Sequence, residues 1–458
     1  MGSGKSGEIK KEKRREGIMN THQKNTEEMI EEKLPLSRNI VLSFQHLFLM
    51  NAYVVPVILA SIIGLSGNGS SALIQATFLA SGITTLLQAK FFMKYPVVYG
   101  ASFVPIGAIV GIYMINGGTQ DAWSYVVGAC LVGAIAIVLL GLSNKFKKIL
   151  DNLVTPVVGA TIVLCIGLSL IPLAFSSMIF VENGLSVKSN ILVAIITIAA
   201  MMIFSMIGNR TGKFATVARI GSGIFALAVG YIAAELLGDI DLTAVKEAAL
   251  ISRPALPFLD FGIKFDILSV ITMIVLYFIL MTETVGTWIA TSCTTQTELT
   301  EKRVNNGVVG LGVSNVVSSL LGTTPMSGYS SNVGILALTN TYSRHVFSYV
   351  GVLLIIVGFS SKLSSFIAVI PSAAVGGIFL LTSGIITSAG INMFKSIEMG
   401  SKETYIVSIA AILAIGLNIL PAGLLESLPV FAQYILGSSI ATSALAAIIL
   451  NKIIPDAK

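Results

Sequence analysis

Glu283 is the side chain of this sequence with the strongest claim to chemistry. It lies in the apolar segment Phe265–Thr291, and the nearest acids along the chain are Asp266 and Glu298. An ionisable group inside an apolar segment is costly and marks a functional site by default. A carboxylate there would accept hydrogen bonds from the N–H groups of a substrate, and the structural alternative is a protonated or hydrogen-bonded glutamate. Gly286 would let a second helix or a ligand approach closely.

A second polar pair, Gln45 and His46, lies in the first apolar segment of the chain. A lone histidine in an apolar helix is more often a hydrogen-bonded structural group than a proton carrier. Gln45 lies at the same level, so the pair favours a hydrogen-bond network between helices.

Membrane-spanning helices must hold these residues. The chain has 458 residues, of which 54% are hydrophobic and 11% charged. Soluble domains carry about 25% charged residues, so this chain lacks the charge to cover a surface facing water. Its net charge of +6 is not gathered into one stripe, which argues against a nucleic-acid partner. Cys130, Cys165 and Cys293 stand singly, without metal spacing, so we expect no metal and no cofactor.

About fourteen apolar segments reach spanning length. Their centres fall near Tyr53, Leu79, Ile106, Ala134, Leu164, Ile198, Ala226, Val275, Gly312, Ile335, Ile355, Ile378, Ile409 and Ala441. If the N-terminus is inside, the loops after even-numbered segments carry Lys and Arg and most other loops do not, with Lys362 as an exception. This pattern predicts an even number of spans and two cytoplasmic termini.

The long loop 235–266 divides the segments into two halves of seven. An odd number per half inverts one half relative to the other, so we expect an all-α polytopic fold with a 7+7 inverted repeat. Residues 1–38 are polar and lack the apolar region of a signal peptide, which predicts a disordered cytoplasmic tail before a transporter domain at 39–458. Residues 11–17, just before Met19, are of the types that a purine-rich ribosome-binding site would encode if it were translated. We therefore expect that the natural start is Met19 and that residues 1–18 are not native.

Two segments break the spanning pattern. Residues 95–105 hold two prolines around a β-branched stretch, and residues 322–334 are rich in turn formers. They are the third and tenth segments, which occupy corresponding positions if the repeating unit has seven spans. Interrupted spans at corresponding positions mark a transport site, and the alternative is a pair of ordinary kinks. We expect short extended segments there, followed by helix starts that aim backbone N–H groups at a ligand.

These features together resemble the nucleobase–ascorbate transporter family, which includes bacterial uracil and xanthine permeases, from Leu42 to Ile453. The motifs that carry the resemblance are Gln45-His46 in the first span, Pro96-x-x-x-Gly100-x-Ser102-Phe103 in the third, Glu283-x-x-Gly286 in the eighth and Ser331-Asn332-x-Gly334-x-x-x-x-Thr339-Asn340 in the tenth.

The resemblance implies a core of spans 1–4 and 8–11 (about 39–143 and 265–370). This core would move, as in an elevator, against a gate of spans 5–7 and 12–14 (about 152–238 and 371–453) that often carries a homodimer contact. The implied protein is a cell-membrane importer of a purine or pyrimidine nucleobase such as uracil or xanthine, coupled to protons or another cation, and not an enzyme. The implied substrate-binding residues are Glu283, Phe103, Ser102, Ser331 and Asn332. The implied structural or coupling network is Gln45, His46, Thr287, Gly286, Gly334 and Thr339.

Three departures from the family pattern leave substrate and coupling open. Ser331 stands where relatives have glutamine or glutamate, which leaves a wider or water-filled pocket. Thr287 and Val309 stand where proton-linked side chains are common. The alternatives are an anion transporter of the sulfate-permease type on the same fold, an uncoupled facilitator and, least favoured, a polytopic membrane enzyme. Glu283 argues against the anion transporter, and the lack of a buried catalytic constellation argues against the enzyme.

Overall fold

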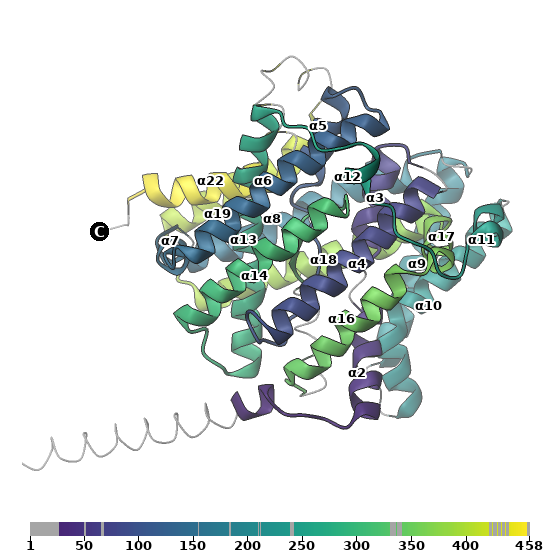
Figure 1. Cartoon of the computed structure of the whole chain (residues 1–458), viewed down its shortest axis with the longest axis horizontal. Helices are drawn as coiled ribbons and strands as arrows, with labels where there is room; N and C mark the ends of the chain where they lie inside the picture. Colours follow the sequence, from purple (N-terminus) through teal and green to yellow (C-terminus); the bar gives the residue numbers. More distant parts are fainter. Residues whose placement is uncertain are drawn as a thin grey trace, which may run out of the picture.

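The structure is a computed structural model. It describes residues 27–455 except 50–51, 66–67, 154, 183–184, 209, 211, 239–241, 330–335, 337–340, 421–423, 425–427, 429–431, 433–435 and 437–438. The described part is a bundle of helices with one small sheet (Figure 1).

The first half of the chain contains α2 (Leu36–Leu49), α3 (Val54–Ile62), α4 (Asn68–Lys90), β1 (Tyr99–Ala101), α5 (Ile106–Ile115), η1 (Gln120–Ala122), α6 (Trp123–Leu142), α7 (Phe146–Leu153), α8 (Pro156–Ala174), η2 (Phe175–Ile179), α9 (Val187–Gly208) and α10 (Lys213–Leu237). The rest contains α11 (Thr243–Glu247), α12 (Pro257–Asp260), α13 (Ile267–Thr295), α14 (Glu301–Leu320), β2 (Met326–Gly328), α16 (Arg344–Gly358), α17 (Ser361–Ala368), α18 (Ser372–Met393), η3 (Phe394–Ser396), α19 (Ser401–Gly416), η4 (Leu417–Ile419) and α22 (Ser439–Ile453).

Six of the described helical segments are long and apolar enough to cross a membrane, judged by length and composition. The pair α16 and α17, bent by 81°, adds a seventh, and four shorter helices of 10–17 residues are also apolar. Several spans are therefore interrupted rather than continuous. The first span is one of them, since α2 ends at Leu49 and α3 begins at Val54, a break that the sequence analysis did not anticipate.

Two helix pairs at the centre of the bundle correspond to each other under the sevenfold repeat. In the 7+7 repeat, α4 corresponds to α14 and α16 corresponds to α6. The helix α4 packs along α16, and α14 packs in the same way along α6 (Figure 1). Glycines lie at both crossings: a Cβ at Gly82 would meet the Gly351 carbonyl oxygen at 2.6 Å, and one at Gly312 would meet the Val138 nitrogen at 2.7 Å. Small residues let helices approach closely where lipid gives no hydrophobic drive for association.

The short extended segments predicted in spans 3 and 10 are confirmed as β1 and β2. They pair antiparallel, with Tyr99 opposite Gly328 and Ala101 opposite Met326. All residues of both strands are buried. Non-helical backbone is tolerated at membrane depth when protein surrounds it, so this pairing is what allows both spans to be broken.

The prediction of a disordered tail over residues 1–38 is wrong for its last part. Residues 27–30 form a helical turn, and Ile30 and Leu34 are buried against the bundle. The Asn39 amide donates to the Leu34 carbonyl at 2.8 Å. The polar composition misled because a few apolar side chains and charge pairs are enough to hold so short a segment. Residues 1–26, including Met19, lie outside the described part.

We expect Gly82→Ala to destabilise the protein by about 1–3 kcal/mol, because its Cβ would press on the backbone of α16 and force the helices apart. The matched control is Gly384→Ala in α18, where no described atom lies within 4 Å of the added Cβ. That change is expected to be neutral or stabilising, since alanine is the better helix former. Thermal unfolding of the purified variants in detergent measures both, and equal midpoints would contradict the close crossing.

Candidate functional site

Glu283 lies along α13, on the side of this helix that meets the small sheet. Asp266 begins the helix, with its carboxylate accepting from the Ser269 backbone N–H at 2.8 Å, and Gln296 ends it in the left-handed conformation at φ 55°. Between these two caps the helix is apolar apart from threonines and serines and Glu283, which is half-buried. The predicted position near the middle of a span is confirmed.

The Glu283 carboxylate is bonded to the interrupted third span. Ser102 Oγ donates to Glu283 Oε2 at 2.8 Å, and Ser102 is completely buried. The Ser102 hydroxyl also accepts from the Val104 N–H at 3.2 Å, and the Ser102 N–H donates to the Pro325 carbonyl at 2.8 Å. One serine therefore joins the carboxylate to both interrupted spans, because Pro325 directly precedes β2.

Ser327, in the middle of β2, presents a second hydroxyl to the same carboxyl. Its Oγ is buried and makes no hydrogen bond to any described residue. The sequence alone gives Ser327 no role, because strand register decides which way a strand residue faces and three residues show no alternation. Ser102, directly after β1, and Ser327, in β2, therefore bring one hydroxyl from each half of the chain to the carboxyl, and of the two only Ser102 forms a hydrogen bond among the described groups.

Each strand is held by a polar side chain from the helix that precedes it. On α4, Thr85 Oγ1 accepts from the Tyr99 N–H at 3.0 Å. On α14, Asn315 clamps Met326: its Oδ1 accepts from the Met326 N–H at 2.6 Å and its Nδ2 donates to the Met326 carbonyl at 3.2 Å. The two anchors occupy corresponding places in the inverted halves.

Thr287, one of the unusual positions of this sequence, binds backbone. Its Oγ1 donates to the Gly328 carbonyl at 2.9 Å, and Thr284 Oγ1 accepts from the Gly328 N–H at 3.3 Å. Two threonines one turn apart on α13 therefore satisfy both polar groups of the last residue of β2. The predicted network at Thr287 is thus a contact with the sheet.

Aromatic side chains bound the site. The Phe103 ring, directly after Ser102, lies 5.4 Å from the ring of Phe379 on α18. The Tyr329 ring packs against Gly100, where an added Cβ would overlap it, and its hydroxyl donates to the Ala101 carbonyl at 3.0 Å. Glycine at position 100 therefore leaves room for an aromatic ring across the two strands.

The other predicted site residues are placed as follows. Next to Gly286, no described atom lies within 4 Å of where a Cβ would stand, so the space beside Glu283 is open toward the described part of the chain. His46 is buried on α2 with its ring 4.6 Å from that of Phe347 on α16. The side chain of Gln45, together with Ser331, Asn332, Gly334 and Thr339, lies outside the described residues.

Two cavities of about 550 and 190 Å³ lie elsewhere, and neither is lined by Glu283. Residues 330–335, which follow Tyr329 along the chain, lie outside the described residues. Among the described residues, no three His, Cys, Asp or Glu side chains come together as a metal site would require. Cys130 and Cys165 are buried free thiols.

An intramembrane carboxylate between two broken spans of an inverted repeat is the arrangement of a polytopic membrane transporter. The fold agrees with solved structures: the transmembrane domain of a cyanobacterial bicarbonate transporter, BicA, superposes with a TM-score of 0.62 at 16% identity, covering 85% of this chain and 98% of that one. The structure of SLC26A9 superposes with a TM-score of 0.55 at 12% identity, covering 90% of this chain and 66% of that one. This transporter fold has the 7+7 inverted repeat that the span arithmetic predicted.

The sequence decides the family within that fold. The profile Xan_ur_permease, described as a permease family, matches residues 37–423. "Nucleobase transporter PlUacP" of Paenibacillus larvae is 28% identical over 91% of this chain and 94% of its own length. "Uric acid permease PucK" of Bacillus subtilis is 28% identical over 90% and 94%, and "Xanthine permease XanQ" of Escherichia coli is 28% identical over 93% of each. The chain therefore belongs to the nucleobase–ascorbate transporter family, as its motifs predicted, and its relatives are permeases rather than enzymes.

We expect Asn315→Ala to destabilise the protein, because it leaves the buried N–H and carbonyl of Met326 without their partner. An unsatisfied buried polar group costs about 1–3 kcal/mol. The control is Asn305→Ala on the same helix, since Asn305 is also buried but its Oδ1 has no partner among the described residues. Thermal unfolding compares the two variants, and an equal loss in both would contradict the anchoring role of Asn315.

Proposed function

We propose that this protein carries a nucleobase across the cell membrane and that Glu283 binds it. The observation that supports this most is the Glu283 carboxylate held by Ser102 between the two interrupted spans. The relatives named above are permeases for xanthine, uric acid and nucleobases, which gives the chemical class of the substrate. The protein is placed with both termini in the cytoplasm, following the Lys and Arg of its loops.

The chemistry of a base fits this arrangement. Purines and pyrimidines such as xanthine and uracil offer N–H donors beside carbonyl acceptors. A carboxylate accepts N–H bonds strongly where water is scarce, and Glu283 has acceptor capacity beyond the Ser102 bond. Ser327 Oγ, buried and unbonded among the described groups, is a donor for a ring carbonyl. Phe103 offers a face for the ring, and Ser331 and Asn332 complete the pocket in this proposal.

We assign the open space beside Gly286 to the substrate. A glycine one turn from Glu283 keeps that face of α13 free of side-chain atoms, and no described residue fills it. A serine at 331 reaches less far than the glutamine or glutamate of relatives. In this proposal the shorter side chain leaves room for a bicyclic purine or a water molecule, with pyrimidines as the alternative substrates.

Coupling to protons, in this proposal, runs through Glu283 itself. Thr287 is engaged with the Gly328 carbonyl and is not ionisable, and Val309 is apolar. Because only the ionised carboxylate accepts the N–H bonds, a proton and the base compete for Glu283, so binding of the base releases the proton of the carboxyl group. An uncoupled facilitator is the alternative. Accumulation of the base against its concentration gradient, abolished by a proton uncoupler, would exclude it.

Transport is proposed to proceed by movement of one helix group against another. The core group contains α4, α6, α13, α14, α16 and α17, which contact one another directly or through a shared neighbour. The gate group contains α8, α9, α10, α18, α19 and α22. Two aromatic contacts that join the groups are Phe103, beside the core helices, with Phe379 of α18, and Tyr231 of α10 with Phe366 of α17, whose rings lie 5.9 Å apart.

We expect Glu283→Gln to abolish uptake of labelled nucleobase by cells expressing the protein, because the amide keeps the size but loses the charge that accepts N–H bonds. The control is Glu398→Gln, an exposed glutamate before α19, which should transport like the wild type. Uptake is measured with xanthine, urate, hypoxanthine and uracil in competition. Wild-type uptake by the Glu283→Gln variant would refute the assignment, and uptake of sulfate or bicarbonate instead of any base would favour the anion transporter.

A covalent cross-link between the groups should stop transport, while one within the core group should not. In a background without native cysteines, Tyr231→Cys with Phe366→Cys places thiols on α10 and α17 that a cleavable bifunctional thiol reagent can bridge across the space the two rings occupied. Ser71→Cys with Ser365→Cys places thiols on α4 and the same α17, where the two serine hydroxyl oxygens lie 3.0 Å apart. We expect the reagent to inhibit the first pair severalfold, reversibly when the linker is cleaved, and to leave the second pair active. Equal activity of both cross-linked pairs would exclude relative movement of the groups.

A further inference from the structure

Residues 27–34 lie across one end of the bundle as a strap, which runs to the left from the lower end of α2 in Figure 1. Two arginines hold it in bidentate ion pairs. Arg303 donates from Nη1 and Nη2 to the two oxygens of Glu27 at 2.7 and 2.9 Å. Arg344 donates from Nε and Nη2 to those of Glu31 at 2.6 and 2.7 Å. Bidentate arginine–carboxylate pairs are stronger and geometrically stricter than single contacts.

The strap joins helices that are distant in sequence. Arg344, the first residue of α16, also donates from Nη1 to the Ala89 carbonyl at the end of α4. Ser343 donates to the Glu32 carbonyl at 2.5 Å. The Glu31 carboxylate thus lies at the N-terminus of α16, where a negative charge is favoured. Its hydrogen bonds from Arg344 lower the pKa of Glu31, so this pair is intact at neutral pH and lost only as the pH falls through that lowered value.

Arg303 connects the strap to Tyr95, which lies four residues before β1. Its guanidinium lies over the ring of Tyr95, 5.1 Å from the ring centroid. Tyr95 is 1% exposed, and its hydroxyl is hydrogen-bonded with Thr297 at 2.7 Å and Thr295 at 3.2 Å, at the end of α13. Tyr95 therefore ties the chain that leads into β1 to the helix that carries Glu283, and Arg303 covers that tie.

We propose that Glu27 and Arg303 are positioning residues: the strap holds Arg303 on Tyr95, and Tyr95 holds β1 and α13 in the register that brings Ser102 to Glu283. The carboxylates of the strap bind the arginines at this end of the bundle. Because the Glu27 side chain is 43% exposed and that of Arg303 only 16%, the contact is open to salt and to competing anions while the tyrosine beneath it is shielded.

The test uses the full chain in lipid nanodiscs and hydrogen exchange of the peptides that cover residues 95–104. We expect Glu27→Gln to speed their exchange about threefold to fivefold, because an exposed ion pair contributes modestly. The matched control is Glu28→Gln, an exposed neighbour with no ion pair among the described residues, which should exchange like the wild type. In about 1 M salt, where charges are screened within about 3 Å, the Glu27 effect should vanish.

A double-mutant cycle tests the route. In an Arg303→Gln background, Glu27→Gln should add nothing further to the exchange rates, because Glu27 acts only through Arg303. Additive effects, or a Glu27→Gln variant that exchanges like Glu28→Gln, would overturn the proposal.

The transport readout rests on the proposed function. Glu27→Gln should raise KM for the nucleobase about threefold to fivefold with little change in the maximal rate, since it loosens the site without removing a group that touches the base. If no nucleobase is transported by the wild type, the proposed function fails, while the hydrogen-exchange comparison still decides whether the strap positions β1.

Discussion

The pairing of β1 with β2 is the constraint on which the rest of the structure depends. Each strand interrupts a span at membrane depth, where an unpaired backbone N–H or carbonyl costs several kcal/mol. The strands satisfy each other, and their remaining groups bind side chains of three different helices: Thr85 of α4, Asn315 of α14 and the Thr284–Thr287 pair of α13. These four buried polar side chains therefore satisfy backbone groups that the two broken spans expose.

The same pairing explains why the site belongs to both halves of the chain. Glu283 comes from the second half and Ser102 from the first, and their hydrogen bond spans the junction of the inverted repeats. A carboxylate on a continuous helix, facing two segments that are not helical, can be approached by a ligand without unwinding the helix that carries it. The bicarbonate transporter BicA has the same fold, so the fold alone does not choose the solute.

The sequence predicted those features of the fold and the site whose signals lie within a short stretch of the chain. The isolated acid and the proline and turn residues of the two breaks are local signals, and they predicted where Glu283 lies in its span and where the extended segments form. The roles of Asn315 and Ser327 depend on contacts across the fold, and a three-residue strand has no alternation to read. The break between α2 and α3 had a signal that was overlooked: Pro56 stands in the first turn of α3, where proline favours a helix start. The prediction of a disordered tail failed for a different reason. Residues 27–34 are held by arginines more than 250 residues away in the sequence.

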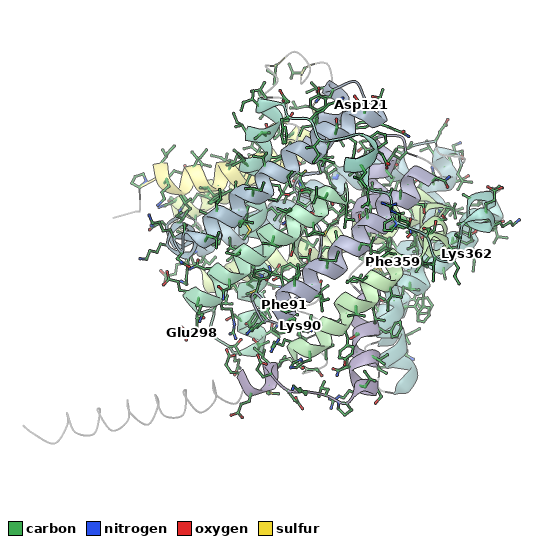
Figure 2. The ribbon with its side chains drawn as sticks, viewed as in Figure 1. Lys90, Phe91, Asp121, Glu298, Phe359 and Lys362 are labelled. Carbon is green, nitrogen blue, oxygen red and sulfur yellow. The ribbon has the colours of Figure 1, made fainter. Side chains whose placement is uncertain are left out.

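Contacts at the opposite end of the bundle complete the comparison between the two ends. Lys90 and Glu298 lie toward one end in Figure 2, and Asp121 and Lys362 lie away from them. There, the loop before α13 is fastened to the core group: the Ser252 N–H donates to the Phe359 carbonyl, the Lys362 N–H to that of Ala249, and Lys264 pairs with Asp121. Both the strap and this loop are therefore attached to the group that carries Glu283. If that group moves, both must move with it, and the chain crosses between the two groups in three places: between α7 and α8, between α10 and α13, and between α17 and α18.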